Sequence, residues 1–188
     1  MRIPIFTILM ALAGSLALAT PGAAQVDEPA GTKIDAEAVR AMLIRGFEQS
    51  RDMDLDYCRA MPDSALRWKP NPEVRDYAQQ IVHISEGNLG IVAGAVMGAA
   101  PPSLGDSAVY LSDAAALEAA VSQAYDWVLE GLRDISAEEL AVQTNLFGMD
   151  MAKWRVYNFA LVHAYWTRGQ LVPYVRAHGV QPPQYRPY

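Results

Sequence analysis

Residues 161–183 read LVHAYWTRGQLVPYVRAHGVQPP, and this stretch decides the fold. It predicts an aromatic-rich helix that Pro173 should bend by removing one backbone hydrogen bond, and that Gly179 should end. His163 and Thr167 are four residues apart, so they share one helix face with Cβ atoms about 6 Å apart. A second histidine at position 167 would indicate a metal site, whereas threonine does not.

Two helices are expected in the first half of the chain. Asp35 is suited to cap a helix whose apolar residues recur at helical spacing and stop before Pro62. The sequence KPNP at 69–72 is a rigid connector, because each proline fixes its own φ and keeps the preceding residue out of the helical region. A second helix is expected to follow over about 74–97.

A loop rich in proline and glycine separates these helices from the second half. Ser112 and Asp113 precede an alanine-rich run and are suited to cap a third helix. Capping-box spacing then indicates a short helical turn at 136–141. The next residues, 142–149, read as an extended excursion that ends in a glycine turn.

The last helix should begin near Asp150 and continue towards His178. It is apolar on most of its circumference, as expected for a helix surrounded by others, and Tyr165 and Trp166 are interpreted as core residues. There is no sign of a second strand of any length. The sequence therefore predicts an all-α fold, an up-and-down four-helix bundle over residues 35–183.

Glycines are unusually frequent in the second helix. Gly90, Gly94 and Gly98 recur at intervals of four, and each costs about 1 kcal/mol relative to alanine in a helix interior. Such spacing leaves a bare ridge on one face. We interpret the ridge as a place where another helix packs closely, with room for a ligand as the alternative.

Residues 1–24 have the pattern of a signal peptide. Arg2 precedes an apolar core at 3–19, small residues stand before an expected cleavage site, and a polar leader at 25–34 follows. The pattern predicts a periplasmic or secreted protein, with a retained membrane anchor as the alternative. After cleavage no membrane span is expected, because the apolar run at 89–100 is too short.

The charge balance argues against nucleic acid as a partner. The chain has 15 basic and 21 acidic residues and a formal net charge of −6, and no basic run overrides that sign. A single cysteine, Cys58, cannot form an internal disulfide, so it is either a buried small residue, which we favour, or a bridge between chains. Residues 184–188 form a short C-terminal tail.

A spaced motif near the C-terminus consists of His163, Thr167, Gly169, Gln170, Gly179, Pro182 and Pro183. It resembles the end of the DinB-like family, small four-helix-bundle proteins whose last helix reads His-x-x-x-His-x-Gly-Gln and ends near Gly-x-x-Pro-Pro. A looser match covers 61–86, where His83 fills the position of a histidine in the family's second helix. The resemblance implies a divalent metal, zinc or nickel, held by His83 and His163 with Thr167 at the third ligand position. It also implies association through bundle faces into a homodimer.

The metal site implied by this resemblance lacks its third histidine. His178 cannot supply it, because 15 residues separate it from His163, about 22 Å along a helix. A neutral threonine hydroxyl is a poor ligand for zinc or nickel. A carboxylate from Glu86, Asp54 or Asp56 could instead complete a set of two histidines and one carboxylate.

A site without metal is the other interpretation of the two histidines. They could be buried hydrogen-bonding partners of each other, of Thr167 or of Tyr57. Arg168 could hold an anionic ligand in a neighbouring pocket, or could be an ordinary surface arginine. The candidate pocket residues are Tyr57, Glu86, Trp166, Arg168 and Gln170.

Other catalytic schemes have no motif behind them. The chain has no Gly-x-Ser-x-Gly elbow and no phosphate-binding glycine loop, and its one cysteine has no histidine near it in sequence. Two functions remain. The first is an exported DinB-like protein with a degenerate divalent-metal site that acts as a small-molecule-binding or accessory bundle. The second is a metal-dependent hydrolase or transferase that uses His83 and His163 with a water or carboxylate ligand.

Overall fold

The computed structural model describes residues 35–186. The described residues all belong to one compact unit. The expected signal peptide and the polar leader therefore lie outside the described residues.

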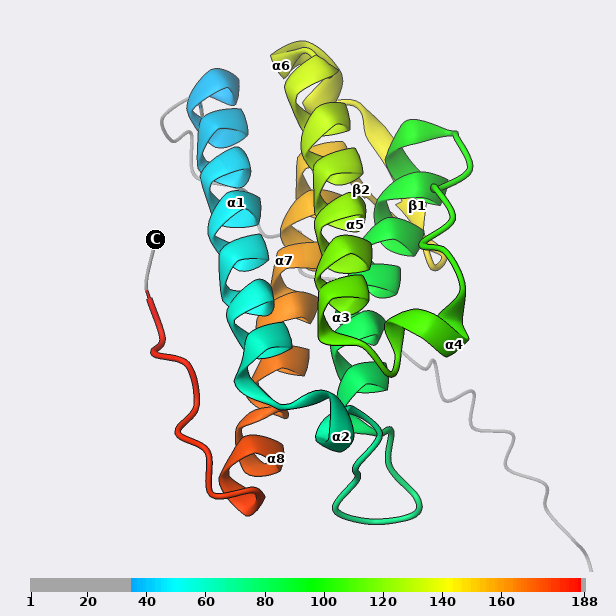
Figure 1. Cartoon of the computed structure of the whole chain (residues 1–188). Helices are drawn as coiled ribbons and strands as arrows, with labels where there is room; N and C mark the ends of the chain where they lie inside the picture. The colour runs from blue at the N-terminus through cyan, green and yellow to red at the C-terminus, as the bar shows by residue number, and fades with distance from the viewer. Residues whose placement is uncertain (1–34, 187–188) are drawn as a thin grey trace, which may run out of the picture. The chain divides into compact units, whose positions relative to one another are not determined.

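Four long helices make up the unit: α1 (Ala36–Ala60), α3 (Tyr77–Val92), α5 (Ala114–Asp134) and α7 (Lys153–Gly169) (Figure 1). Short helices connect or extend them: α2 (Asp63–Leu66), the π-helix η1 (Ala93–Met97), α4 (Ser107–Tyr110), α6 (Ala137–Leu140) and α8 (Val172–Ala177). The expected all-α four-helix bundle is confirmed. Its local start signals also hold, because the side chains of Asp35, Asp113 and Ser136 accept hydrogen bonds from the first turns of α1, α5 and α6.

The helix directions do not alternate strictly along the chain. The guanidinium of Arg40, near the start of α1, donates to the carbonyl of Ile135, whereas Arg59 at its end binds Glu118, so α1 and α5 are antiparallel. A Cβ on Gly131, near the end of α5, would collide with Met97, which follows α3, so α3 and α5 run parallel. The long connection over residues 98–113, which contains α4, makes this possible by returning the chain along the bundle (Figure 1).

A β-hairpin precedes α7 where only one extended segment was expected. Strands β1 (Gln143–Leu146) and β2 (Met149–Ala152) pair antiparallel, and Phe147 and Gly148 turn between them with φ of 54° and 83°. Two positive φ values are typical of the tight turns that match strand twist. Asp150 pairs with Asn145 inside the hairpin, so the last helix begins at Lys153, three residues later than expected.

The last helix is broken where continuity with a bend was expected. α7 ends at Gly169, and α8 begins at Val172 with Pro173 in its first turn. Proline is favoured there because its missing N–H has no helical partner in any case. Gly179, with a φ of 72°, follows α8 as the predicted stop.

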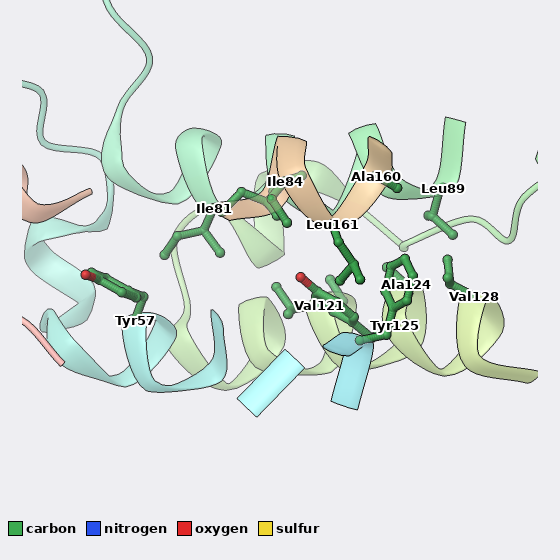
Figure 2. Packing of buried hydrophobic residues seen from close by; sticks show 14 of the residues in the cluster. Tyr57, Ile81, Ile84, Leu89, Val121, Ala124, Tyr125, Val128, Ala160 and Leu161 are labelled. Atoms are coloured by element: carbon green, nitrogen blue, oxygen red, sulfur yellow. The ribbon is translucent and has the colours of Figure 1, made fainter. Parts of the chain in front are cut away.

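The core lies between the long helices and is rich in aromatic rings. Phe47 packs edge-on against Tyr125 and Tyr157, with ring centroids 6.4 and 6.0 Å apart. Figure 2 shows Ile81 and Ile84 of α3 on the side facing α5, with Leu161 of α7 beside them. Cys58 is fully buried, as predicted. The glycine ridge is not a packing face, because a Cβ on Gly90, Gly94 or Gly98 would meet nothing within 4 Å.

Candidate functional site

Two histidine rings from different helices meet at the surface of the bundle. His83 of α3 and His163 of α7 have ring centroids 5.3 Å apart and lie edge to face. A capping box between Asp76 and Gln79 fixes the start of α3. A Cβ on Gly87, one turn beyond His83, would lie 2.9 Å from Nδ1 of His163 and closer still to its Cε1. Gly87 is therefore the glycine of α3 that makes room for a side chain.

The surroundings of both imidazoles favour their neutral form. Partial burial lowers the pKa of His163, and the positive charge of Arg75 lowers it further. Burial, Arg75 and His163, in that order, lower the pKa of His83. The Nδ1 atom of His163 is buried and has no hydrogen-bond partner among residues 35–186. The hydrogen-bonded pair that the sequence offered as an alternative to a metal site is therefore not formed.

The position of the third ligand is occupied by a buried threonine. Thr167 is 3% exposed, and its carbonyl accepts a long, 3.5 Å hydrogen bond from the amide of Gln80, which also donates to Gln170 over 3.0 Å. In the part of the chain that the structure describes, no group of three or more His, Cys, Asp or Glu side chains could hold a metal ion. The donors present do not fit the three-ligand site that the resemblance implies, because a neutral hydroxyl adds little to two imidazoles.

A cleft of about 350 Å³, lined in part by His83, lies between α3 and the connection that carries α4. Its α3 wall is one helix face, since Gln79, His83 and Glu86 follow one another at spacings of four and three. The full lining is Arg75, Gln79, Val82, His83, Glu86, Ser107, Tyr110 and Leu111. This lining mixes charge, hydrogen-bonding groups and apolar surface, as small-molecule sites do.

The two charged residues of the cleft have different neighbours. Arg75 acts on the histidines, as their lowered pKa values show. Glu86 acts on Tyr110, where it adds to the effect of burial in raising the pKa of the phenol. The α3 wall of the cleft therefore has a positive side chain, Arg75, at one end and a negative one, Glu86, at the other, with His83 between them.

The residues that form this bundle also match the model of a known protein family. A model of the DinB family matches residues 35–186. The chain belongs to the DinB family. Its bundle is similar to a solved DinB-like protein from Bacillus cereus ATCC 10987, with 15% identity, a TM-score of 0.66, and coverage of 77% of this chain and 95% of the other. It is likewise similar to a DinB-like protein from Bacillus subtilis, with 16% identity, a TM-score of 0.63, and coverage of 77% and 96%.

At these identities the two DinB-like structures support the fold alone. No curated protein matches the chain. Within residues 35–186, none of the helices of this DinB-family bundle combines the length and apolarity that a membrane span requires.

A second polar centre of the DinB-family bundle lies deep between α1, α5 and α7. The guanidinium of Arg168 donates to the carboxylate of Asp54 over 2.5 Å and to both the carbonyl and the hydroxyl of Ser50. The phenol of Tyr125 donates to the other oxygen of Asp54, also over 2.5 Å. Burial opposes the charge of Arg168, but Asp54 and Tyr125 together more than compensate, so the pKa of the guanidinium lies above its ordinary value.

The sequence underestimated this centre. Arg168 is 4% exposed and is not a surface residue, and Asp54 faces inward but binds Arg168 instead of the histidines. A signal was present in α1, where Ser50 and Asp54 fall on the same helix face as the apolar Phe47.

The other predicted site residues are dispersed in this DinB-family bundle. Trp166 is 74% exposed and is not part of the core, because α7 turns that face outward. Tyr57 and Arg168 line a separate cavity of about 160 Å³ under the C-terminal segment. Asp56 binds Arg186 at the surface, and His178 packs against Trp68. Of the proposed carboxylates, Glu86 alone shares a cleft with a site histidine.

Proposed function

We propose that this chain is a small-molecule-binding member of the DinB family, in which the cleft beside His83 takes the ligand. The observation that carries the proposal is the composition of that cleft, where a neutral imidazole, a phenol and two oppositely charged side chains line about 350 Å³. That volume falls in the range of about 300–1,000 Å³ that is typical of ligand sites. In this proposal His83 and His163 are the remains of a divalent-metal site, and His83 serves as a binding group of the cleft.

The alternative is a metal-dependent hydrolase or transferase. The unpartnered Nδ1 of His163 beside the ring of His83 favours it, because two free imidazoles can take up zinc or nickel. Thr167 weighs against it, since that position offers no imidazole or carboxylate. Glu86 stands one turn from His83 but does not join the two histidines in a three-ligand group among the described residues.

Metal content separates the two functions. The mature protein, purified without a histidine tag, would be measured by mass spectrometry together with a His83→Ala variant. We expect well under one metal per chain and no uptake of added zinc or nickel. About one metal per chain that is lost in the variant would overturn the binding-protein proposal in favour of the metalloenzyme.

A second variant tests whether the site lacks only its third metal-binding side chain. Thr167→His places a third imidazole one turn from His163. If the pocket keeps the geometry of a metal site, this variant should bind zinc at least about 100-fold more tightly than the original chain. An unchanged affinity would show that the two histidines are not a degenerate metal site.

We also propose that the protein acts outside the cytosol, which rests on the signal-peptide pattern of residues 1–24. N-terminal sequencing of the exported protein should find Gln25 as its first residue. An uncut N-terminus in a membrane fraction would support the retained anchor instead.

A further inference from the structure

The cleft beside His83 holds two charges that nothing in the described residues neutralises. The side chains of Arg75 and Glu86 make no ion pair or hydrogen bond with any residue between 35 and 186. The carboxylate nearest to Arg75 in sequence, Asp76, is already used, because it binds Arg67 over 2.7 Å and caps α3 through the N–H of Gln79. No described side chain therefore pairs with the guanidinium of Arg75 at the cleft.

The side chains of Arg75 and Glu86 also form no ion pair with each other, and their backbone positions are well separated. Arg75 stands two residues before the start of α3, and Glu86 lies nine residues beyond that start, roughly 13 Å along the helix axis. Between them the wall offers the neutral ring of His83, the amide of Gln79 and the apolar surface of Val82. The opposite wall adds the hydroxyl groups of Ser107 and Tyr110.

We propose that the ligand of this cleft is an extended zwitterion, with an anionic group at Arg75 and an ammonium group at Glu86. This inference rests on the proposed function, and it names the class of ligand. The side chains of Arg75 and Glu86 are long and can cover part of the axial separation, so the ligand can be shorter than that separation. A chain of two or three residues spans roughly 7–11 Å when extended, so short linear peptides with free ends belong to this class.

The charge pattern disfavours other ligands. A neutral molecule would cover both charges without pairing them, which costs free energy. A dianion would meet Glu86, and a dication would meet Arg75, so each would be repelled at one end.

Triglycine is the probe, because each of its ends can be blocked separately. Isothermal titration calorimetry on the full mature chain would compare triglycine with N-acetyl-triglycine, with triglycine amide and with glycine. Each blocked end removes one charge-assisted contact, so we expect each blocked peptide to bind roughly tenfold more weakly or worse. Glycine should not bind measurably, because its charges are too close together to reach both ends.

Single variants assign each end of the ligand. In Arg75→Gln, triglycine and triglycine amide should bind alike, because the carboxylate has lost its partner. In Glu86→Gln, triglycine and N-acetyl-triglycine should bind alike. The double reversal Arg75→Glu with Glu86→Arg should restore the preference for triglycine in the opposite orientation. Matched controls are Arg155→Gln and Glu138→Gln, which remove exposed charges outside the cleft and should change nothing.

Two failures can be told apart. If triglycine binds no better than its blocked forms, the zwitterion inference is wrong. The proposed function stands in that case only if a thermal-shift screen finds another small molecule whose binding Tyr110→Ala abolishes. If no ligand depends on Tyr110, Arg75 or Glu86, the cleft is not a binding site and both proposals are overturned.

Discussion

The molecule has two polar centres, and they differ in how completely their groups are paired. Around Arg168 and Asp54 the charges are buried and joined by hydrogen bonds to Ser50 and Tyr125. Around His83 and His163 the rings are half-buried and neutral, and one buried nitrogen has no partner among residues 35–186. The first centre is complete without a ligand. The second has unused binding capacity and borders a cleft, so it is the one available for function.

The largest expected effect comes from breaking the complete centre. Arg168→Met would leave the Asp54 carboxylate buried without its cation, and such losses cost about 3–5 kcal/mol. Chemical denaturation should show this as a lower free energy of unfolding. The double variant Asp54→Leu with Arg168→Met removes both charges and should recover most of the loss, since Ser50 and Tyr125 still bind each other over 2.9 Å. A single variant as stable as the original chain would mean that the ion pair does not hold the bundle together.

A pair of glycine substitutions tests the histidine centre at a smaller scale. Gly87→Ala forces His163 to move and should destabilise the fold by about 1–3 kcal/mol. Gly90→Ala, three residues along the same helix with open space around it, should stabilise the fold by about 0.5–1 kcal/mol. Thermal and chemical unfolding of both variants would give the comparison.

The control for Gly87→Ala is its combination with His163→Ala, in which the methyl group has nothing to strike. That double variant should be more stable than the sum of its single effects predicts. If the two effects simply add, the close approach of Gly87 and His163 is not present in solution.

The pH dependence of stability should show the smallest effect, and the histidine centre should account for part of it. Folding lowers the pKa of both histidines below the ordinary value of about 6.5, so the unfolded chain takes up protons first as the pH falls. Their effect is therefore absent above the unfolded pKa and becomes destabilising as the pH falls through about 6.5 towards the lowered folded values. Denaturation midpoints between about pH 7 and pH 5 should decline less in a His83→Gln, His163→Gln double variant. An identical decline in both proteins would assign it to other groups.

Local chemistry explains why much of the fold could be predicted. The caps at Asp35, Asp113 and Ser136 act within a few residues of their own helices, so they are readable without knowledge of the rest of the chain. The burial of Cys58 could also be predicted from the sequence. Only part of the hairpin was predicted. The glycine turn is a local signal, whereas the pairing of β1 with β2, which places Asp150 in a strand, depends on contacts between two segments.

Only part of the candidate site could be predicted from the sequence. The sequence motif correctly predicted that His83 and His163 lie together. It rested on the spacing of His163 and Thr167 and on the position of His83. The sequence could not predict which carboxylate lies near the histidines. The surroundings of Asp54 and Glu86 depend on which other segments pack against their helices. Arg75, which supplies the positive end of the cleft, stands in a connector with no motif of its own, so no sequence signal indicated it.

The sequence by itself determined the helix content, the four-helix bundle and the two histidines, because helical periodicity, caps and a spaced motif are properties of neighbouring residues. Tertiary structure alone decided that Arg168 is buried on Asp54, that Trp166 faces outward, and that Gly87, rather than Gly90, is the glycine of α3 with a packing role. Those outcomes depend on which helix lies against which. The direction of α5 and the long connection before it set that arrangement, and no local pattern encodes either one.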